Sequence, residues 1–290
     1  MRRMKLITSG LGFIFLLLLP LISMAAISGI DLNQSTIQVT YTPDFLVSFV
    51  LSNTLKKDIT PSCKFTVLDP ACGSGAFLVE SYKSILDSYP STIDFQTKTS
   101  ILENQIFGID TDVNALLITA FSLYLVLLES EDPAIIKQKI IDAYPILPSL
   151  INRTLINNNT LIDDIFENMT FNYIVGNPPW GSADNEMEKK AIGQKNKAGE
   201  IVAYKSVSDY ERSQAFLLRV KSWSDSLTTI ALIVKNSIFL NINSEDFRRE
   251  LLSQYNIESF YELSNYNKIL FEKKTIGNIN KHKIEIGATE

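Results

Sequence analysis

The sequence predicts an α/β protein built on a doubly wound, mostly parallel β-sheet. Short buried strand patterns alternate with helical patterns from Thr36 onwards. One glycine-rich loop runs from a strand directly into a helix, and every distinctive loop follows the end of a strand. Strands that alternate with helices form parallel sheets covered on both faces. Ligands of such sheets bind at the carboxyl ends of the strands, which is where these loops fall.

Six strands and the helices between them are expected along the chain. Apolar side chains at helical spacing follow a turn-like Thr-Pro pair and predict a first helix over about 44–55. The strands are expected at 64–69, 104–110, 153–158, 171–176, 228–236 and 257–263. Further helices are expected after the glycine-rich turn of 69–75 and at 111–130, 208–223 and 244–254, with a linker containing local helix at 130–152 and a long polar loop at 181–207.

Composition excludes some classes of protein. The chain has 290 residues, of which 46% are hydrophobic and 20% charged, as in an ordinary globular protein. Its net charge of −5 does not indicate a nucleic-acid binder, so any such partner must use a local basic surface. Cys63 and Cys72 form no CxxC motif and His282 is the only histidine, which argues against a disulfide framework and against a metal site. A reducing, cytoplasmic location is expected.

The first 35 residues are set apart from the domain expected over residues 36–290. A basic start is followed by an apolar run from about Leu11 to Ile22 and then by small residues, which is the layout of a secretory signal peptide. Gly12 and Pro20 interrupt the run, and it is short for a membrane span. A buried helix, or translated sequence upstream of an internal start at Met24, are the alternatives.

The glycine-rich turn has the sequence DPACGSG, Asp69 to Gly75. Gly73 and Gly75 allow positive φ and close approach of the backbone to a ligand, and the next helix offers unpaired amide groups. A dinucleotide fingerprint would need a third glycine at Leu78, and a P-loop would need Gly-Lys-Ser/Thr. Asp69 at the strand end suits a ligand that carries an ammonium group.

A second acid, Asp110, ends the next predicted strand beside the glycine-rich turn. A carboxylate in this place can accept hydrogen bonds from both hydroxyls of a ribose. Alternatively Asp110 or Asp112 caps the following helix, and Asp112 fits that role better because it is closer to the helix start. An ammonium site beside a ribose site favours S-adenosylmethionine over a nicotinamide cofactor.

The loop Asn177-Pro178-Pro179-Trp180 follows the strand 171–176. Two prolines fix the backbone and leave its carbonyls free as acceptors, and the Asn177 side chain adds another acceptor. Such a cluster matches an amino group on a planar ring, on which Trp180 could stack. A base inside a duplex would have to flip out to reach the loop. The alternative is a proline-stiffened loop with an incidentally buried tryptophan.

In this order, the two motifs resemble those of the amino-methyltransferases, most closely the adenine-N6 DNA methyltransferases of restriction–modification systems, over about residues 40–275. The resemblance implies the Rossmann-like class I S-adenosylmethionine-dependent methyltransferase fold, that cofactor, and double-stranded DNA with a flipped adenine as substrate. It implies that Asn177 to Trp180 are catalytic and that Trp180 and Phe271 hold the base. The implied cofactor residues are Tyr41, Thr42, Pro43, Asp69, Ala71, Gly73, Gly75, Phe77, Asp110, Asn159 (with Asn158 or Asp163 as alternatives) and Phe216.

The sequence also departs from that family. Only residues 275–287 remain for the last, antiparallel strand, so that strand is expected to be incomplete, and a target-recognition domain is expected to be absent. Either a partner, such as a specificity subunit or restriction endonuclease, reads the DNA sequence, or the chain is a truncated or split product. Alternative substrates are a protein glutamine or an RNA base, and the remaining alternative is a non-catalytic cofactor-binding module.

Two further features of the sequence are a group of lysines and the two cysteines. Lys189, Lys190, Lys195 and Lys197 either contact DNA phosphates or belong to a solvated loop with nearby glutamates. Cys72 is expected to be a small packing residue, and neither cysteine has the Pro-Cys setting of a cytosine-C5 enzyme.

Overall fold

The computed structural model describes residues 42–263, except 59, 61–63, 92, 130, 142–146, 164 and 194–205. Its contacts divide the chain into two units. One unit, residues 41–127 with 149–272, contains the sheet and is called the sheet unit below. The other consists of residues 1–40, 128–148 and 273–290, and its described helix is α7, Pro133–Ile141.

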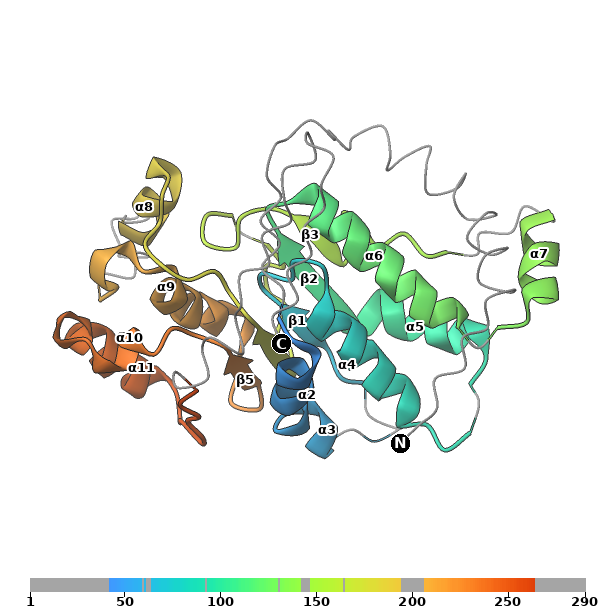
Figure 1. Cartoon of the computed structure of the whole chain (residues 1–290), viewed down its shortest axis with the longest axis horizontal. Coiled ribbons are helices and arrows are strands. Elements are labelled where there is room, and N and C mark those ends of the chain that lie inside the picture. The colour runs from blue at the N-terminus through green and yellow to red at the C-terminus, as the bar shows by residue number, and fades with distance from the viewer. Residues whose placement is uncertain are drawn as a thin grey trace, which may run out of the picture. The chain divides into compact units, whose positions relative to one another are not determined.

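The sheet unit contains five parallel strands within its described residues (Figure 1). They are β1 Val67–Asp69, β2 Ile106–Asp110, β3 Leu155–Asn157, β4 Tyr173–Gly176 and β5 Thr229–Leu232, in the order β3-β2-β1-β4-β5. Leu68 of β1 pairs with Phe107 of β2 on one side and with Ile174 of β4 on the other. The strand order therefore reverses between β1 and β4, and a doubly wound sheet binds ligands at this switch point. The predicted doubly wound, mostly parallel sheet is confirmed.

The helices follow the predicted alternation for most of the sheet unit. They are α2 Asp44–Ser52, α3 Leu55–Asp58, α4 Ala76–Asp87, α5 Phe95–Gln105, α6 Val113–Leu128, α8 Glu186–Gly193, α9 Arg212–Arg219, α10 Ser237–Leu240 and α11 Glu245–Gln254. Short 3-10 helices lie at η2 Ser208–Tyr210, η3 Val220–Trp223 and η4 Ile242–Ser244. Helix α4 packs against β1 and β2, and α2 packs against α4. These contacts bring the segment before the first strand to the first βα turn.

The core beneath the sheet is aromatic and aliphatic. Leu68, Ile109 and Ile174 from the three central strands pack with Phe171 and Trp223. The indole Nε1 of Trp223 donates to the Ile165 carbonyl at 2.8 Å, so burial leaves its polar group paired. Burying such large side chains against the strands fixes the sheet, and with it the loops at the strand ends.

Several predicted elements differ in the structure. Residues 257–263 form no strand, because an alternating pattern makes a strand only where a neighbour supplies hydrogen bonds, and most of these side chains are exposed. The expected loop 181–207 contains α8 among its described residues. Helices α5 and α10 were not predicted. The segments 1–35 and 275–287 lie outside the described residues, so the expectations for them stay predictions.

Among the residues that the structure describes, no helix is both long enough and apolar enough to cross a membrane. In the same residues, no group of histidine, cysteine and acidic side chains could hold a metal ion. The expected cytoplasmic location stays a prediction.

Candidate functional site at the carboxyl ends of the central strands

The glycine-rich turn connects β1 to α4 and is held by β2. Gly73 and Gly75 have φ of 52° and 84°, as predicted. The Cys72 amide donates to the Ile109 carbonyl at 2.9 Å, and the Gly73 amide donates to Asp110 Oδ2 at 2.8 Å. Cys72 itself is buried and packs in the core, as predicted, and burial raises the pKa of its thiol. The turn is therefore a fixed backbone cradle.

Asp69 is a buried acid at the end of β1. Its side chain is 1% exposed, and Oδ1 accepts a hydrogen bond from the Ala71 amide at 3.0 Å. Burial, with a smaller contribution from the negative charge of Asp110, raises the pKa of Asp69 to about 8. A positively charged ligand group would stabilise the ionised carboxylate, which is the chemistry predicted for an ammonium site.

Asp110 ends β2 and connects two loops. Its Oδ2 accepts from Gly73, and its Oδ1 accepts from the Asp112 amide at 2.8 Å. Burial raises the pKa of Asp110. Asp112 directly precedes α6 and accepts from the Asn114 amide at 2.8 Å, so the expected helix cap is Asp112. Asp110 is thereby left as the acid that faces the glycine-rich turn.

The Asn-Pro-Pro-Trp loop leaves β4 beside Asp69. The Asn177 Nδ2 donates to Thr42 Oγ1 at 3.1 Å, whereas the Asn177 Oδ1 is buried without a partner among the described residues. An unpaired buried acceptor costs about 1–3 kcal/mol, so a ligand N–H in this place would be stabilised. Pro178 is buried, and the half-buried Trp180 donates from Nε1 to the Ile233 carbonyl at 3.2 Å. The indole is therefore fixed at its polar edge.

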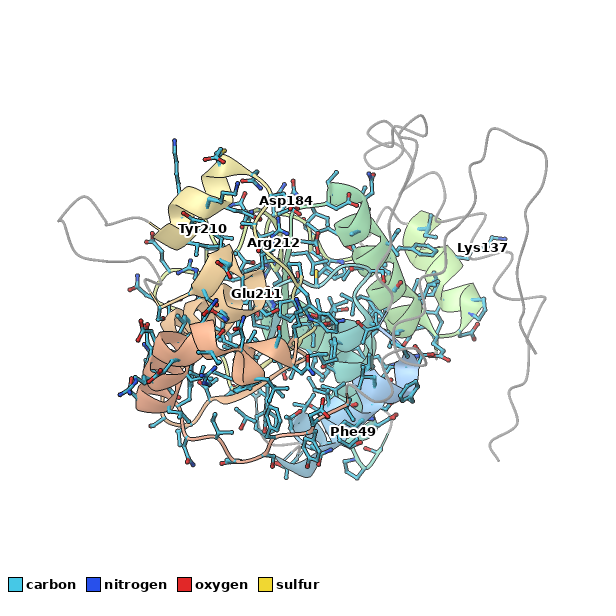
Figure 2. The ribbon with its side chains drawn as sticks, turned by 60° about the vertical axis from the view of Figure 1, so that its left-hand side comes forward. Phe49, Lys137, Asp184, Tyr210, Glu211 and Arg212 are labelled. Atoms are coloured by element: carbon cyan, nitrogen blue, oxygen red, sulfur yellow. The ribbon has the colours of Figure 1, made fainter. Side chains whose placement is uncertain are left out.

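The exit of this loop is hydrogen-bonded to the segment before α9. Asp184, next to the exit, and Tyr210 and Glu211 of that segment are labelled in Figure 2. Ser182 and Glu211 form an antiparallel bridge, and the Ala183 amide donates to the Tyr210 carbonyl at 3.0 Å. The Gly181 amide donates to Glu211 Oε1 at 2.7 Å. Asp209 and Tyr210 have positive φ of 50° and 54°, a strained conformation for non-glycine residues. The sequence offered no sign of this contact, because its partners are some thirty positions apart.

A buried ion pair holds α8 next to the loop. Arg212 donates from Nε to Glu188 Oε2 at 2.8 Å and from a terminal nitrogen to Asp184 at 3.1 Å. Glu188 is 8% exposed and also accepts from Asn159 Nδ2 at 2.9 Å. The network therefore joins the segment after the Asn-Pro-Pro-Trp loop to Asn159, one of the predicted cofactor residues. The sequence did not predict a role for Glu188 or Arg212 at this site.

The residues predicted around the cofactor adenine lie together. Phe216 is 4% exposed and belongs to a cluster with Leu161, against which Ala71 of the glycine-rich turn packs. Asn159 lies two residues before Leu161 and accepts from its amide at 2.9 Å. Of the two alternatives, Asp163 accepts from the Asn159 amide, and Asn158 donates its amide to the Asp110 carbonyl.

The other predicted site residues are buried in the core, lie on the surface of α8, or fall outside the described residues. Phe77 of α4 is 2% exposed, and its side chain is buried in the core. Lys189 pairs with Glu186 at 3.2 Å, and Lys190 is exposed. Tyr41, Phe271, Lys195 and Lys197 lie outside the described residues.

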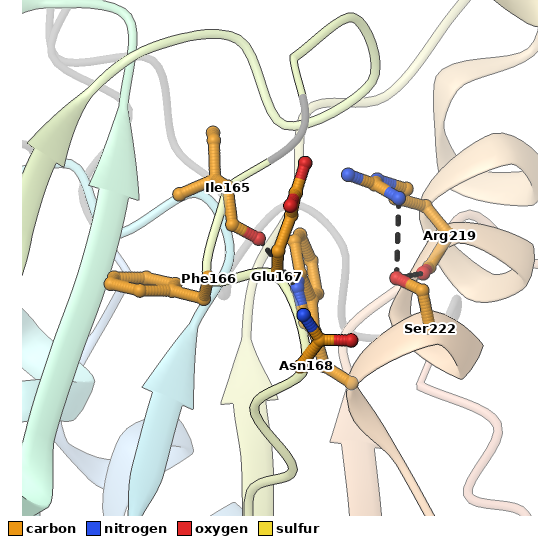
Figure 3. Close-up of a pocket in the computed structure, with 7 residues that line it drawn as sticks. Ile165, Phe166, Glu167, Asn168, Arg219 and Ser222 are labelled. Atoms are coloured by element: carbon orange, nitrogen blue, oxygen red, sulfur yellow. Dashed lines mark hydrogen bonds between the residues drawn. The ribbon is translucent and has the colours of Figure 1, made fainter.

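Two pockets in the described part of the sheet unit bear on the site. One of about 220 Å³ lies beside Arg219 (Figure 3). The guanidinium of Arg219 lies over the Trp223 ring, 4.6 Å from the ring centroid. None of the predicted site residues lines this pocket. The other, of about 160 Å³, is lined by Ser182 and Glu211 at the loop exit and by polar side chains of η2, α9, α10 and η4. These polar side chains largely hydrogen-bond to one another, for example Gln214 to Ser244 at 2.9 Å.

Comparison with known families decides the classification. The model of the Eco57I restriction-modification methylase family matches residues 104–270, which is more than half of the chain. The chain belongs to the Eco57I methylase family. The match includes Asp110, Asn159, the Asn-Pro-Pro-Trp loop and Phe216, and it confirms the resemblance to restriction–modification methylases.

A curated relative agrees with the Eco57I family assignment. The Type II restriction enzyme and methyltransferase RM.Eco57I of Escherichia coli is 28% identical, and the match covers 74% of this chain. It covers 25% of the relative, so the chain spans about a quarter of that protein's length.

Solved structures show the fold that this Eco57I family chain adopts. A modification subunit of a putative type I restriction enzyme from Vibrio vulnificus superposes with a TM-score of 0.50 at 20% identity, covering 83% of this chain and 42% of that one. The Type ISP restriction-modification enzyme LlaGI superposes with a TM-score of 0.52 at 13% identity, covering 75% of this chain and 20% of that one. The fold is the predicted class I S-adenosylmethionine-dependent methyltransferase fold.

Proposed function

We propose that this chain transfers a methyl group from S-adenosylmethionine to the N6 amino group of a flipped adenine in double-stranded DNA, as the modification activity of a restriction–modification system. The observation that carries the proposal is the buried Oδ1 of Asn177, directly after β4, which has no hydrogen-bond donor among the described residues. The buried carboxylate of Asp69 lies against Gly176, the residue before Asn177. Membership of the Eco57I methylase family supports the same activity.

The residues present suit the methyl donor. A buried acid at β1 would pair with the ammonium group, the cradle of Gly73 and Gly75 would allow close approach of the backbone, and Asp110 would hold the ribose. Ala71, Asn159 and Phe216 would enclose the adenine ring of the cofactor, and Thr42 and Pro43 would border its methionine end. When bound, S-adenosylmethionine supplies an electrophilic methyl group.

Asn177 and Pro178 would then activate the substrate. The adenine amino group would donate its two N–H bonds to Asn177 Oδ1 and the Pro178 carbonyl. These contacts draw the nitrogen toward tetrahedral geometry and release its lone pair from the ring. The lone pair would then be free to accept the methyl group that S-adenosylmethionine supplies when bound, leaving S-adenosylhomocysteine, and the surplus proton of the amine would pass to water. Trp180 would stack on the base, with Phe271 on its other side.

DNA binding beyond the flipped base is also proposed. Lys189 and Lys190 lie on α8, directly after the loop, and would contact phosphates at the mouth of the site. A specificity subunit or restriction endonuclease is the expected protein partner, in line with a relative that is both restriction enzyme and methyltransferase.

The test compares Asn177→Ala with the wild type. Tritiated S-adenosylmethionine is offered in parallel to unmodified duplex DNA, RNA and protein, and the labelled base is identified by nucleoside chromatography. We expect label in N6-methyladenine, a loss of about 10²-fold or more in the variant because a preorganised polar contact is removed, and unchanged binding of S-adenosylhomocysteine. Asn104→Ala makes the same change on the exposed face of α5, where the amide bonds only to its own helix, and should behave as wild type.

Other outcomes of this test are equally informative. Label in RNA or protein would replace the proposed substrate, and full activity of Asn177→Ala would disprove the mechanism. Cofactor binding without transfer to any acceptor would favour a binding module that needs a partner chain for activity.

A further inference from the structure

One contact connects the proposed catalytic loop to the start of the domain. The Nδ2 of Asn177 lies 3.1 Å from Oγ1 of Thr42, although the two residues are 135 positions apart. Thr42 is 8% exposed, so water does not compete freely for its hydroxyl. The sequence predicted Thr42 beside the methionine end of the cofactor, and this contact was not foreseen.

Thr42 is held in place by the helix that follows it. It precedes Pro43, and a residue before proline is confined to extended conformations. The Pro43 carbonyl accepts from the amides of Leu46 and Val47 at 2.9 and 3.1 Å, which fixes the first turn of α2. Both side chains are 2% exposed. The Thr42 hydroxyl is therefore held close to the start of α2, one face of which is buried.

The direction of the contact decides which end of the carboxamide is left over. A carboxamide has a donor end and an acceptor end, and Thr42 takes the donor end. The acceptor end, Oδ1, is left buried without a partner in the described part of the chain. Rotating the amide by 180° would present Nδ2 in its place, and an N–H donor facing an amino group makes no hydrogen bond. A hydroxyl can also donate, but while the Thr42 hydroxyl accepts from Nδ2, as it does in this structure, Oδ1 is the atom left to receive an amine.

We propose that Thr42 is a positioning residue, whose hydroxyl accepts from Asn177 Nδ2 and so holds Oδ1 toward the amino group of the substrate. The inference rests on the proposed function, because it assumes that Asn177 receives an amine. Two roles for Thr42, contact with the cofactor and positioning of Asn177, predict different effects of a substitution. A cofactor contact would change the affinity for the cofactor, whereas a positioning residue changes the rate at saturating cofactor.

Thr42→Val and Thr42→Ser test the proposal in the full chain. Valine keeps the shape and removes the hydroxyl, and serine keeps the hydroxyl. We expect Thr42→Val to lower kcat for methyl transfer to duplex DNA by about 10- to 100-fold, because small misplacements in a site cost this much. The dissociation constant of S-adenosylhomocysteine should change less than about threefold, well under a tenfold change worth 1.4 kcal/mol. Thr42→Ser should restore the rate.

Thr54→Val is the matched control. Thr54 follows α2, is 6% exposed, and its hydroxyl donates to the Val50 carbonyl at 2.9 Å, away from the loop. It should keep the wild-type rate. An unchanged rate in Thr42→Val, or a loss explained by weaker cofactor binding, overturns the proposal.

A second readout needs no activity. The side-chain amide protons of Asn177, assigned by their loss in Asn177→Ala, are followed by nuclear magnetic resonance and hydrogen exchange. They should be protected in the wild type and in Thr42→Ser, and should shift and exchange faster in Thr42→Val. Equal protection in all three proteins would overturn the positioning role. If the Asn177 amide responds as expected but neither the wild type nor the variants methylate DNA, the proposed function is wrong, whereas the contact between Thr42 and Asn177 is confirmed.

Discussion

The carboxylate of Asp69 occupies the space that a side chain at Gly176 would need. A Cβ added to Gly176 would lie 2.5 Å from Asp69 Oδ1, closer than real contacts allow. Gly176 ends β4 and leads into the Asn-Pro-Pro-Trp loop. The proposed cofactor acid therefore lies against the residue from which the proposed catalytic loop leaves β4.

Gly176→Ala should disturb cofactor binding through Asp69. Overpacking costs about 1–3 kcal/mol of stability, and the displaced carboxylate should weaken binding of S-adenosylhomocysteine at least about tenfold. Gly181→Ala is the comparison, because a Cβ there meets nothing within 4 Å and only the φ of +90° is strained. It should cost about 1–2 kcal/mol and leave the affinity unchanged. Equal losses of affinity by calorimetry would contradict the link to Asp69.

Asp69 should make the ligand-free protein less stable as the pH rises. Burial raises the pKa of Asp69 from 3.8 to about 8, so between these values the folded protein keeps a proton that the unfolded chain has lost. Stability is then greatest below pH 3.8 as far as this group is concerned, and it falls until the pH passes about 8. Asp69→Asn should flatten the decline of Tm between these limits. Asp112→Asn keeps a helix cap and should leave the slope as it is; if it flattens the slope equally, Asp69 is not the cause.

Glu188→Gln should destabilise the protein more than Asp184→Asn does. Both acids pair with Arg212, but the side chain of Glu188 is 11% exposed and that of Asp184 is 87% exposed. Breaking a buried pair costs about 3–5 kcal/mol, whereas an exposed pair contributes about 0–1 kcal/mol. Urea unfolding measures both changes. Similar values for the two variants would show that water reaches Glu188 and that the network does not hold α8.

Gly75→Ala should cost more stability than Gly73→Ala. Both glycines have positive φ, which costs any other residue about 1–2 kcal/mol. A Cβ at Gly75 would also lie 2.6 Å from Thr119, whereas one at Gly73 would meet nothing within 4 Å. Overpacking should add about 1–3 kcal/mol in the first case only. Thermal unfolding measures the loss of stability in both variants. Equal losses would mean that Thr119 on α6 moves to make room for the added Cβ.

The features that could be predicted from the sequence are those determined by a residue and its neighbours along the chain. The positive φ of Gly73 and Gly75, the cap at Asp112 and the acids at the strand ends each follow from residue type and neighbours. Helix α5 was missed because its apolar residues are few, although Asp94 caps it by accepting from the Thr97 amide at 2.7 Å. The Asp94-x-x-Thr97 pair was the available signal.

The features that escaped prediction depend on long-range pairing. Residues 257–263 have a strand-like pattern, but no pattern of one segment reveals whether another strand lies beside it. Glu188 and Arg212 are separated by 24 positions, and nothing distinguishes Glu188 from the exposed glutamates around it until the fold buries it. The contact of Thr42 with Asn177 is of the same kind.

The bridge between Ser182 and Glu211 makes the chain between them a loop with clasped ends. Because both ends are hydrogen-bonded to each other, the geometry of the Asn-Pro-Pro-Trp loop does not depend on how many residues join Gly193 to Ser206. Lengthening a loop costs little entropy, about 0.6 kcal/mol per doubling. The segment between Gly193 and Ser206 is therefore suited to the insertion of another domain. Such a domain would be attached close to the proposed site, and the geometry of the Asn-Pro-Pro-Trp loop would be kept.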